Sequence, residues 1–202
     1  REMQRMTYLM NPDIPMEGKA WSFEQGYAIA TYSKPVVALS TLQRRVGDEA
    51  MAEFLRAYVD RYAFAHPTAE DLRAVMAETL GEGEATWFFD EVVAGGRTAN
   101  ARIEALSAED ARLIREGELC LPTVVKVIDD GTVRVVDWPC DRSERSLTPA
   151  PDVIEIDPQH VNLLDENLAD NGLRRRPDGW AWLGMAARLI RTLQSFYRGG
   201  GL

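Results

Sequence analysis

Apolar residues recur at helical spacing through the first half of the chain. A first stripe runs from Phe23 to Gly47, and residues 1–22 before it predict a short helix followed by a proline-rich loop. The core-facing positions predicted for this stripe are Ile29, Tyr32, Val36, Leu39 and Leu42. Because Pro35 lacks an N–H, it either kinks a longer helix or lies in the first turn of a helix beginning near Ser33. Both interpretations place Tyr32 at a helix discontinuity.

Three further helices are predicted between residues 48 and 96. The first has Asp48 as its N-cap. Its predicted core face consists of Met51, Phe54, Leu55, Tyr58, Val59 and Tyr62. The second begins at Thr68, which is spaced from Asp71 as in a capping box, and it ends at Gly81. The third is short and stops at Gly95-Gly96; its apolar residues are Trp87, Phe88 and Val92.

The second half of the chain is rich in β-branched residues. Segments 123–128 and 132–136 flank Asp129-Asp130-Gly131, which predicts a hairpin, and 153–156 is a further strand closed by Asp157-Pro158. Segments 103–106 and 111–115 are also candidate strands. Residues 107–110 between them fit a helix cap equally well, so the sequence leaves strand and helix open there.

A C-terminal amphipathic helix is predicted from Asp178 onward. Its apolar positions are Trp182, Ala186, Ile190, Leu193 and Tyr197. From Arg174 the chain carries six arginines and one aspartate, a local charge of +5 within a total of −9, which leaves −14 for the rest. Trp180 and Trp182 beside these arginines fit a helix at a membrane surface, and packing against the acidic body is the alternative.

Composition restricts the class of protein. The 202 residues, 46% of them hydrophobic, suffice for one large or two small folded domains. A net charge of −9 argues against nucleic acid as a partner. No apolar run reaches the length of a membrane-spanning helix, and no signal peptide is recognisable, so we expect a soluble protein, cytoplasmic or peripheral to the membrane. The first residue is Arg1 rather than methionine, and we expect that a further segment precedes it.

Few residues suit the usual catalytic or metal motifs. His66 and His160 lie far apart, and neither belongs to an H-E-x-x-H pair, so both are expected to be surface or structural residues. The chain has no phosphate-binding glycine loop, Cys-x-x-Cys pair or G-x-S-x-G motif. Cys120 and Cys140 lie almost symmetrically about the Asp130-Gly131 turn, and whether they are bonded or free stays open.

The order of several segments resembles the C-terminal half of the catalytic domain in family-one zinc metallopeptidases, the aminopeptidase N type of gluzincin. These segments are Gly26–Pro35, Val36–Leu42, Gly47–Glu49, Phe54–Tyr58 and Tyr62–Leu72. Later segments look like the β-sandwich that follows in this family: Gly117–Val127, Val153–Pro158 and Leu163–Asn167. The resemblance spans residues 25–172. It implies an α+β protein with helical residues 1–98, an Ig-like antiparallel sandwich over 99–172, and a C-terminal helix and tail over 173–202.

Carried over by position, Tyr32 matches the catalytic tyrosine of the family, which donates a hydrogen bond to the oxyanion formed during peptide hydrolysis. The structural alternative is that Tyr32 belongs to the apolar face of its helix. Tyr27 matches a second aromatic near the substrate site, although packing accounts for it equally well. Lys34 matches the lysine of Tyr-x-Lys-Gly and receives no chemical step. Pro35 departs from the family by replacing the glycine, which affects how Tyr32 is aimed.

The resemblance implies zinc in a longer parent protein and none in this chain, because the zinc ligands of the family precede the segment corresponding to Arg1. A peptide substrate and the N-terminal remainder of the same protein are the implied partners. This chain alone is therefore expected to be an inactive part of an aminopeptidase. The alternative is a scaffold or interaction module with the same architecture.

Overall fold

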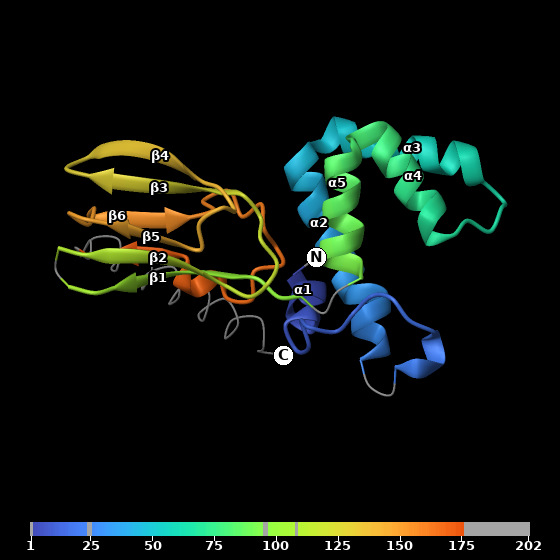
Figure 1. The fold of residues 1–202 in the computed structure, drawn as a ribbon, viewed down its shortest axis with the longest axis horizontal. Helices are drawn as coiled ribbons and strands as arrows, with labels where there is room; N and C mark the ends of the chain where they lie inside the picture. Colours follow the sequence, from blue (N-terminus) through green and yellow to red (C-terminus); the bar gives the residue numbers. More distant parts are fainter. Residues whose placement is uncertain (1, 24–25, 95–96, 108, 176–202) are drawn as a thin grey trace, which may run out of the picture.

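The computed structural model describes residues 2–23, 26–94, 97–107 and 109–175. Helices occupy one half of the molecule and two antiparallel sheets the other, as Figure 1 shows. This arrangement confirms the α+β class. The helix predicted from Asp178 onward lies outside the described residues. Within the described ranges, no helix is both long and apolar enough to cross a membrane.

The helical half follows the predicted order. Its elements are α1 Glu2–Tyr8, the 3-10 turn η1 Ala20–Ser22, the π-helical turn η2 Ile29–Ser33, α2 Lys34–Val46, α3 Asp48–Tyr62, α4 Ala69–Leu80, α5 Glu82–Thr86 and the π-helical segment η3 Trp87–Val93. The predicted helix around Trp87 is longer than expected, because α5 begins at Glu82 and runs directly into η3.

Local chemistry sets the helix ends. The Thr68 hydroxyl accepts a hydrogen bond from the Asp71 N–H (3.3 Å), and the Asp71 carboxylate accepts one from the Thr68 N–H (2.8 Å), which confirms the capping box. Gly47 and Gly81 end α2 and α4 with φ of 90° and 97°, where glycine is favoured. The assignment of Asp48 as an N-cap is wrong. Gly47 holds that position, since α3 begins immediately after the glycine.

The helical core is formed by side chains from α1 through η3. The largest of those fully enclosed include Tyr8, Leu42, Phe54, Val75, Met76 and Val92. The predicted stripes are only partly correct. On η2 and α2, Ile29 and Leu42 are buried, but Tyr32 and Val36 are 59% and 37% exposed. On α3, Met51 and Phe54 are buried while Leu55 and Val59 are exposed.

Small and polar side chains account for the error on α2. Its buried face, with that of η2, includes Ala30, Ser33, Lys34, Ala38, Ser40 and Thr41. Such residues pack closely against neighbouring helices but carry no hydrophobic signal, so the sequence pattern points to a face rotated from the true one.

The β half consists of two sheets with the strand orders β1-β2-β5 and β4-β3-β6-β7. The strands are β1 Asn100–Ala105, β2 Ala111–Glu116, β3 Thr123–Asp129, β4 Thr132–Trp138, β5 Glu144–Leu147, β6 Val153–Ile156 and β7 Gly172–Arg174, with a 3-10 turn η4 at Leu168–Asp170. All neighbouring strands within each sheet are antiparallel.

The predicted turns of the β half are present. Asp130 and Gly131 have φ of 45° and 78° and join β3 to β4, with Asp129 opposite Thr132. The segments on either side of residues 107–110 are the paired strands β1 and β2, which decides the open choice between strand and helix. The Ser107 hydroxyl accepts hydrogen bonds from two backbone N–H groups in the turn between them.

The two sheets share one core. It consists of Ala111 and Leu113 from the first sheet and Val125, Val127, Trp138, Ile154 and Ile156 from the second. Cys120 and Cys140, left open by the sequence, form a disulfide across the base of the β3–β4 hairpin, with their Cα atoms 5.9 Å apart. Apolar packing and a covalent link therefore act together in this half.

Side chains of α1 join the two halves. Arg5 donates to the carbonyl oxygens of Leu163 (3.3 Å) and Asp165 (2.6 Å), and the buried Tyr8 hydroxyl donates to that of Leu164 (3.0 Å). Burial raises the pKa of Tyr8 above its ordinary value, so the phenol stays a neutral donor. Residues of the β half also enter the helical core, and the division into domains after residue 98 stays a prediction.

Candidate functional site

The helix changes its hydrogen-bonding register at the position of Tyr32. Ile29–Ser33 is π-helical, α2 follows at Lys34, and the Lys34 N–H donates to the carbonyl of Ile29. Pro35, at the second position of α2, has no N–H to continue the ladder. The predicted discontinuity at Tyr32 is confirmed.

Three aromatic rings follow one another beside this turn, and we name Phe23, Tyr27 and Tyr32 the aromatic row. The ring centroids of Tyr27 and Tyr32 are 6.5 Å apart with an interplanar angle of 86°, and those of Phe23 and Tyr27 are 6.4 Å apart. Such edge-to-face contacts are favourable and restrict how the rings turn. The structure thus brings together the two tyrosines singled out from the sequence.

Tyr32 directs its ring outward from a turn whose other side is buried. Ile29, Ala30 and Ser33 are buried, whereas Tyr32 and Tyr27 are 59% and 43% exposed. Among the described residues, the Tyr32 hydroxyl has no hydrogen-bond partner. It is therefore free to donate a hydrogen bond to a ligand.

Lys34 has a role that the sequence analysis missed. Its side chain is 1% exposed, and its ammonium donates to the carbonyls of Pro12 (3.0 Å) and Ile14 (2.8 Å). Burial lowers the pKa of Lys34 from 10.5 to about 8, and the charge of Asp13 partly opposes this shift. The sequence could have indicated this burial, because Lys34 lies four residues from both Ala30 and Ala38 and shares the buried helix face with them.

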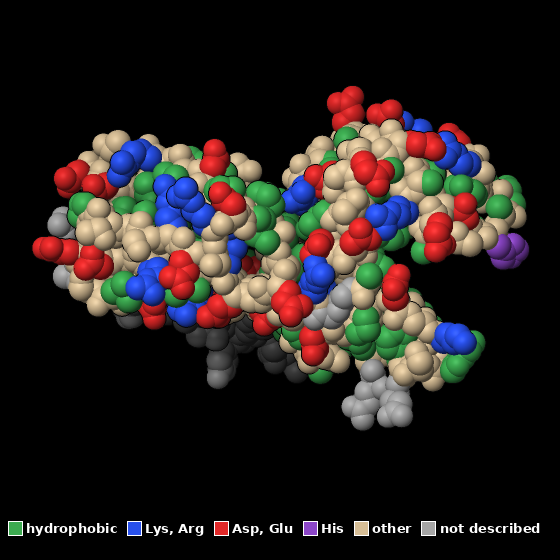
Figure 2. Space-filling view, in the orientation of Figure 1, with side chains coloured by type: hydrophobic (Ala, Val, Ile, Leu, Met, Phe, Trp, Pro, Cys, Tyr) green, Lys and Arg blue, Asp and Glu red, His purple; other side chains and the backbone are tan. Residues whose placement is uncertain are grey.

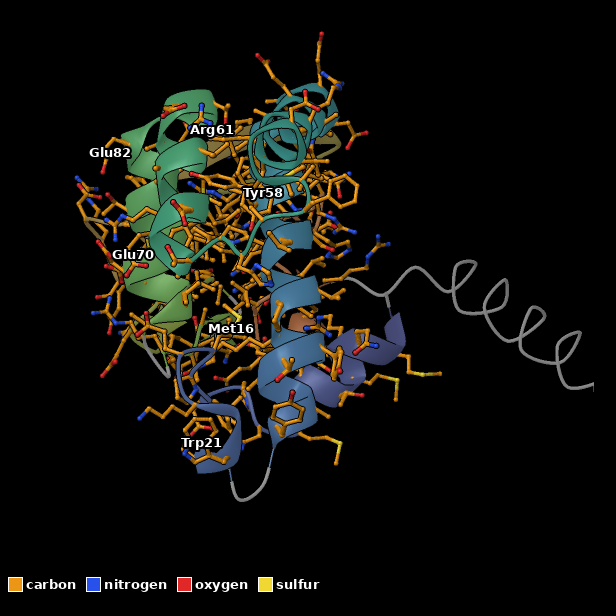
Figure 3. All side chains as sticks on the ribbon, turned by 90° about the vertical axis from the view of Figure 1, so that its right-hand side faces the viewer. Met16, Trp21, Tyr58, Arg61, Glu70 and Glu82 are labelled. Carbon is orange, nitrogen blue, oxygen red and sulfur yellow. A yellow bond between two sulfur atoms is a disulfide. The ribbon has the colours of Figure 1, made fainter. Side chains whose placement is uncertain are left out.

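The carbonyls that bind Lys34 belong to residues 9–19, which we name the N-terminal loop. Ile14 of this loop packs against Ile29, Ala30 and the partly buried Phe23 in a small separate core. A Cβ atom at Gly26 would lie 2.5 Å from the end of the Ile14 side chain, and the φ of 88° at this position favours glycine. Figure 3, in which Met16 and Trp21 are labelled, shows the loop and the η1 turn at the lower end of α2.

Several large apolar side chains are exposed in the N-terminal part of the chain. They are Met3, Met6, Met10, Trp21, Tyr27, Tyr32 and Val36, and we name them the apolar face. Their elements α1, η2 and α2 pack against one another, and the Ser33 hydroxyl donates to the Gln4 side chain (2.7 Å). Figure 2 shows hydrophobic side chains reaching the surface in this N-terminal part, beside acidic and basic groups. Other large apolar side chains are exposed elsewhere, among them Val59, Phe64 and Val135.

The described residues contain no metal centre. His66 and His160 are exposed, as predicted. No group of three or more histidine, cysteine, aspartate or glutamate side chains in the described ranges is placed to hold a metal ion. These residues therefore do not fit a zinc site, and we assign no step of a reaction to a metal bound by them.

No protein-family model matches the chain, and no curated protein matches its sequence. Among solved structures, the chain is similar to an aminopeptidase A of Legionella pneumophila in complex with aspartic acid. The sequence identity is 12% and the TM-score 0.49; the match covers 79% of this chain and 21% of that protein. The chain thus spans about a fifth of the length of that aminopeptidase. Similarity at this level does not assign an activity.

Proposed function

We propose that this chain is the C-terminal portion of a zinc-dependent aminopeptidase and supplies Tyr32 as the hydrogen-bond donor to the oxyanion. The observation that carries the proposal is the geometry of Tyr32. Its hydroxyl is exposed and unpartnered among the described residues, while the turn beneath it is buried and Tyr27 contacts its ring. The sequence resemblance supplies the reaction class, and Tyr27 would lie beside the bound peptide.

The chemistry suits a phenol in this position. When a nucleophile attacks a peptide carbonyl, negative charge develops on the carbonyl oxygen, and a donor that is already oriented stabilises it without reorganisation. A neutral tyrosine hydroxyl donates without adding a charge of its own. The π-helical turn and the Tyr27 contact would limit the movement of the ring, which favours this preorganisation.

Zinc would be held by the N-terminal remainder of the same protein, which would also cover the apolar face. Zinc when bound there would polarise the peptide carbonyl and activate water. The exposed side chains on α1 and η2, together with the outward Tyr32, support a second polypeptide segment over this face. The site would then be closed to bulk water only when both parts are present.

The β half supports an Ig-like sandwich in this proposal. Its orders β1-β2-β5 and β4-β3-β6-β7 correspond to strands A-B-E in one sheet and C-F-G in the other, with β4 added at the edge beside strand C. This half would hold the helical part rigidly through the contacts of α1.

The test compares Tyr32→Phe with Tyr27→Phe in the protein extended to its natural N-terminus. Each change removes one hydroxyl from an exposed ring of the same row. We expect kcat for aminoacyl-anilide hydrolysis to fall about a hundredfold or more for Tyr32→Phe, as for the loss of an oxyanion donor. Tyr27→Phe should change kcat less than tenfold. Near-normal kcat in Tyr32→Phe would reject the assignment, and an extended protein without hydrolase activity would favour the scaffold alternative.

A further inference from the structure

The ammonium of Lys34 connects the start of α2 to the N-terminal loop. Two carbonyls, those of Pro12 and Ile14, accept from Nζ at 3.0 and 2.8 Å, and Asp13 lies between them in the chain. The side chain is almost wholly enclosed. A charged group in such surroundings is retained only when hydrogen bonds compensate for lost solvent, so the loop and the lysine depend on each other.

Leu9 and Met16, in the two halves of the N-terminal loop, pack against the helical core. The apolar packing of the loop beside η2 amounts to one small cluster of Ile14, Ile29 and Ala30. Within the described ranges, one backbone hydrogen bond joins the loop to η3, from the Met16 N–H to the carbonyl of Val93 (3.3 Å). The two charge-assisted bonds from Lys34 therefore restrain the middle of the loop, at Pro12 and Ile14, between the packed residues Leu9 and Met16.

The same loop supports the turn that carries the aromatic row. Ile14 packs against Ile29 and Ala30 on the buried side of η2, and the end of its side chain approaches Gly26. Tyr27 and Tyr32 lie on the other side of this turn. A displacement of the loop would consequently change the packing beneath both rings.

We infer that Lys34 is a positioning residue, whose ammonium fixes the N-terminal loop against η2 and thereby holds the Tyr32 hydroxyl in its donor position. This inference rests on the proposed function. Lys34 touches neither the Tyr32 ring nor, in the proposal, the substrate. It acts through Ile14 and the π-helical turn. Small displacements of a donor are costly in catalysis, which gives a buried restraint of this kind a functional consequence.

The first test uses the 202-residue chain and needs no activity. Lys34→Met keeps the length of the side chain and removes the donors; Lys126→Met, which breaks the surface pair with Glu155, is the control for loss of one lysine charge. We expect exchange of the Ile14 and Met16 amides to accelerate at least tenfold, and the NOE between the Tyr27 and Tyr32 rings to fall by half or more. Exchange of α3 amides should change less than twofold. The control should leave all three unchanged.

The second test uses the protein extended to its natural N-terminus. Lys34→Met should lower kcat about tenfold or more while KM changes less than threefold, since the donor is misplaced but the peptide still binds. If Lys34→Met does not fold, Ile14→Ala tests the same connection without touching the lysine, and it should weaken the ring NOE and lower kcat in the same direction. An unchanged ring NOE in the variant that folds would overturn the inference. Normal kcat in Tyr32→Phe would instead reject the proposed function. The NOE between the Tyr27 and Tyr32 rings would still show whether Lys34 positions these rings.

Discussion

Seven buried residues from two sheets meet in the core of the β half, whereas three, Ile14, Ile29 and Ala30, form the core beneath the aromatic row. The β core is apolar, and a disulfide links the chain on the two sides of the β3–β4 hairpin. The smaller core depends on a lysine ammonium and on a loop. The β half therefore contains its own stabilising interactions, while Tyr27 and Tyr32 of the aromatic row are partly exposed.

The largest effect should come from breaking the core of the β half, the larger of these two. Trp138 is 1% exposed, and the guanidinium of Arg115 lies 3.9 Å from its ring centroid. Trp138→Ala should lower the unfolding free energy by about 3–5 kcal/mol, because it removes a buried indole and leaves a cavity. Chemical denaturation followed by circular dichroism measures this change. A loss below about 1 kcal/mol would mean that the β half does not stabilise the fold as described.

The disulfide offers the next comparison. It closes a loop of 20 residues, so replacing Cys120 and Cys140 with serine should cost about 3 kcal/mol. Denaturation of the double variant, and of the wild type with and without reductant, measures this effect. Loss of the disulfide should leave amide exchange in the N-terminal loop unchanged. Equal acceleration in the loop and in the β half would show that the two regions are not independent.

Lys34 should make the site region depend on pH in a defined direction. Its pKa is 10.5 when unfolded and about 8 when folded, so between these values the unfolded chain binds more protons and stability rises with pH. Relative to Lys34→Met, the wild type should gain roughly 2 kcal/mol of unfolding free energy between pH 8 and pH 10. Parallel denaturation of the two proteins at several pH values measures the gain. A difference that falls over this range would show that the folded protein retains the proton more strongly than the unfolded chain.

The smallest effect comes from a matched pair of methyl deletions. Ile154 lies in the β core and Ile14 in the N-terminal loop, and both are buried. Ile154→Val should lower the global unfolding free energy by about 1 kcal/mol, whereas Ile14→Val should change it by less than about 0.5 kcal/mol. At the Met16 amide, Ile14→Val should accelerate hydrogen exchange more than Ile154→Val does. Equal global effects would indicate that the loop unfolds only with the whole protein.

Regular patterns made much of this fold predictable. The Asp130-Gly131 hairpin, the strand at residues 153–156 and the Thr68 capping box are local features, so short stretches of sequence suffice to indicate them. The discontinuity at Tyr32 was also predictable, because the missing N–H of Pro35 acts within a single turn. Tyr27 lies beside Tyr32, and the roles of both stay predictions.

The buried face of α2 was not predictable in the same way. Hydrophobic spacing assigned Tyr32 and Val36 to the core, whereas Lys34 and Thr41 are the residues enclosed there. A lysine is buried only where acceptors form hydrogen bonds with its ammonium. For Lys34 these acceptors are carbonyls about twenty residues earlier in the chain. The same limitation applies to Cys120 and Cys140, whose bond depends on how the ends of β3 and β4 meet.

The sequence by itself determined the order of helices and strands, the turn at Asp130-Gly131 and the break at Tyr32, since propensity, capping and proline act over a few residues. Only the tertiary structure decided which side of that break is buried, that the Lys34 ammonium meets two carbonyls of the N-terminal loop, and that Tyr32 directs its ring outward. Burial is a property of packed neighbours rather than of one segment. Residues distant in the chain therefore determine which side of a local pattern becomes core and which becomes a candidate site.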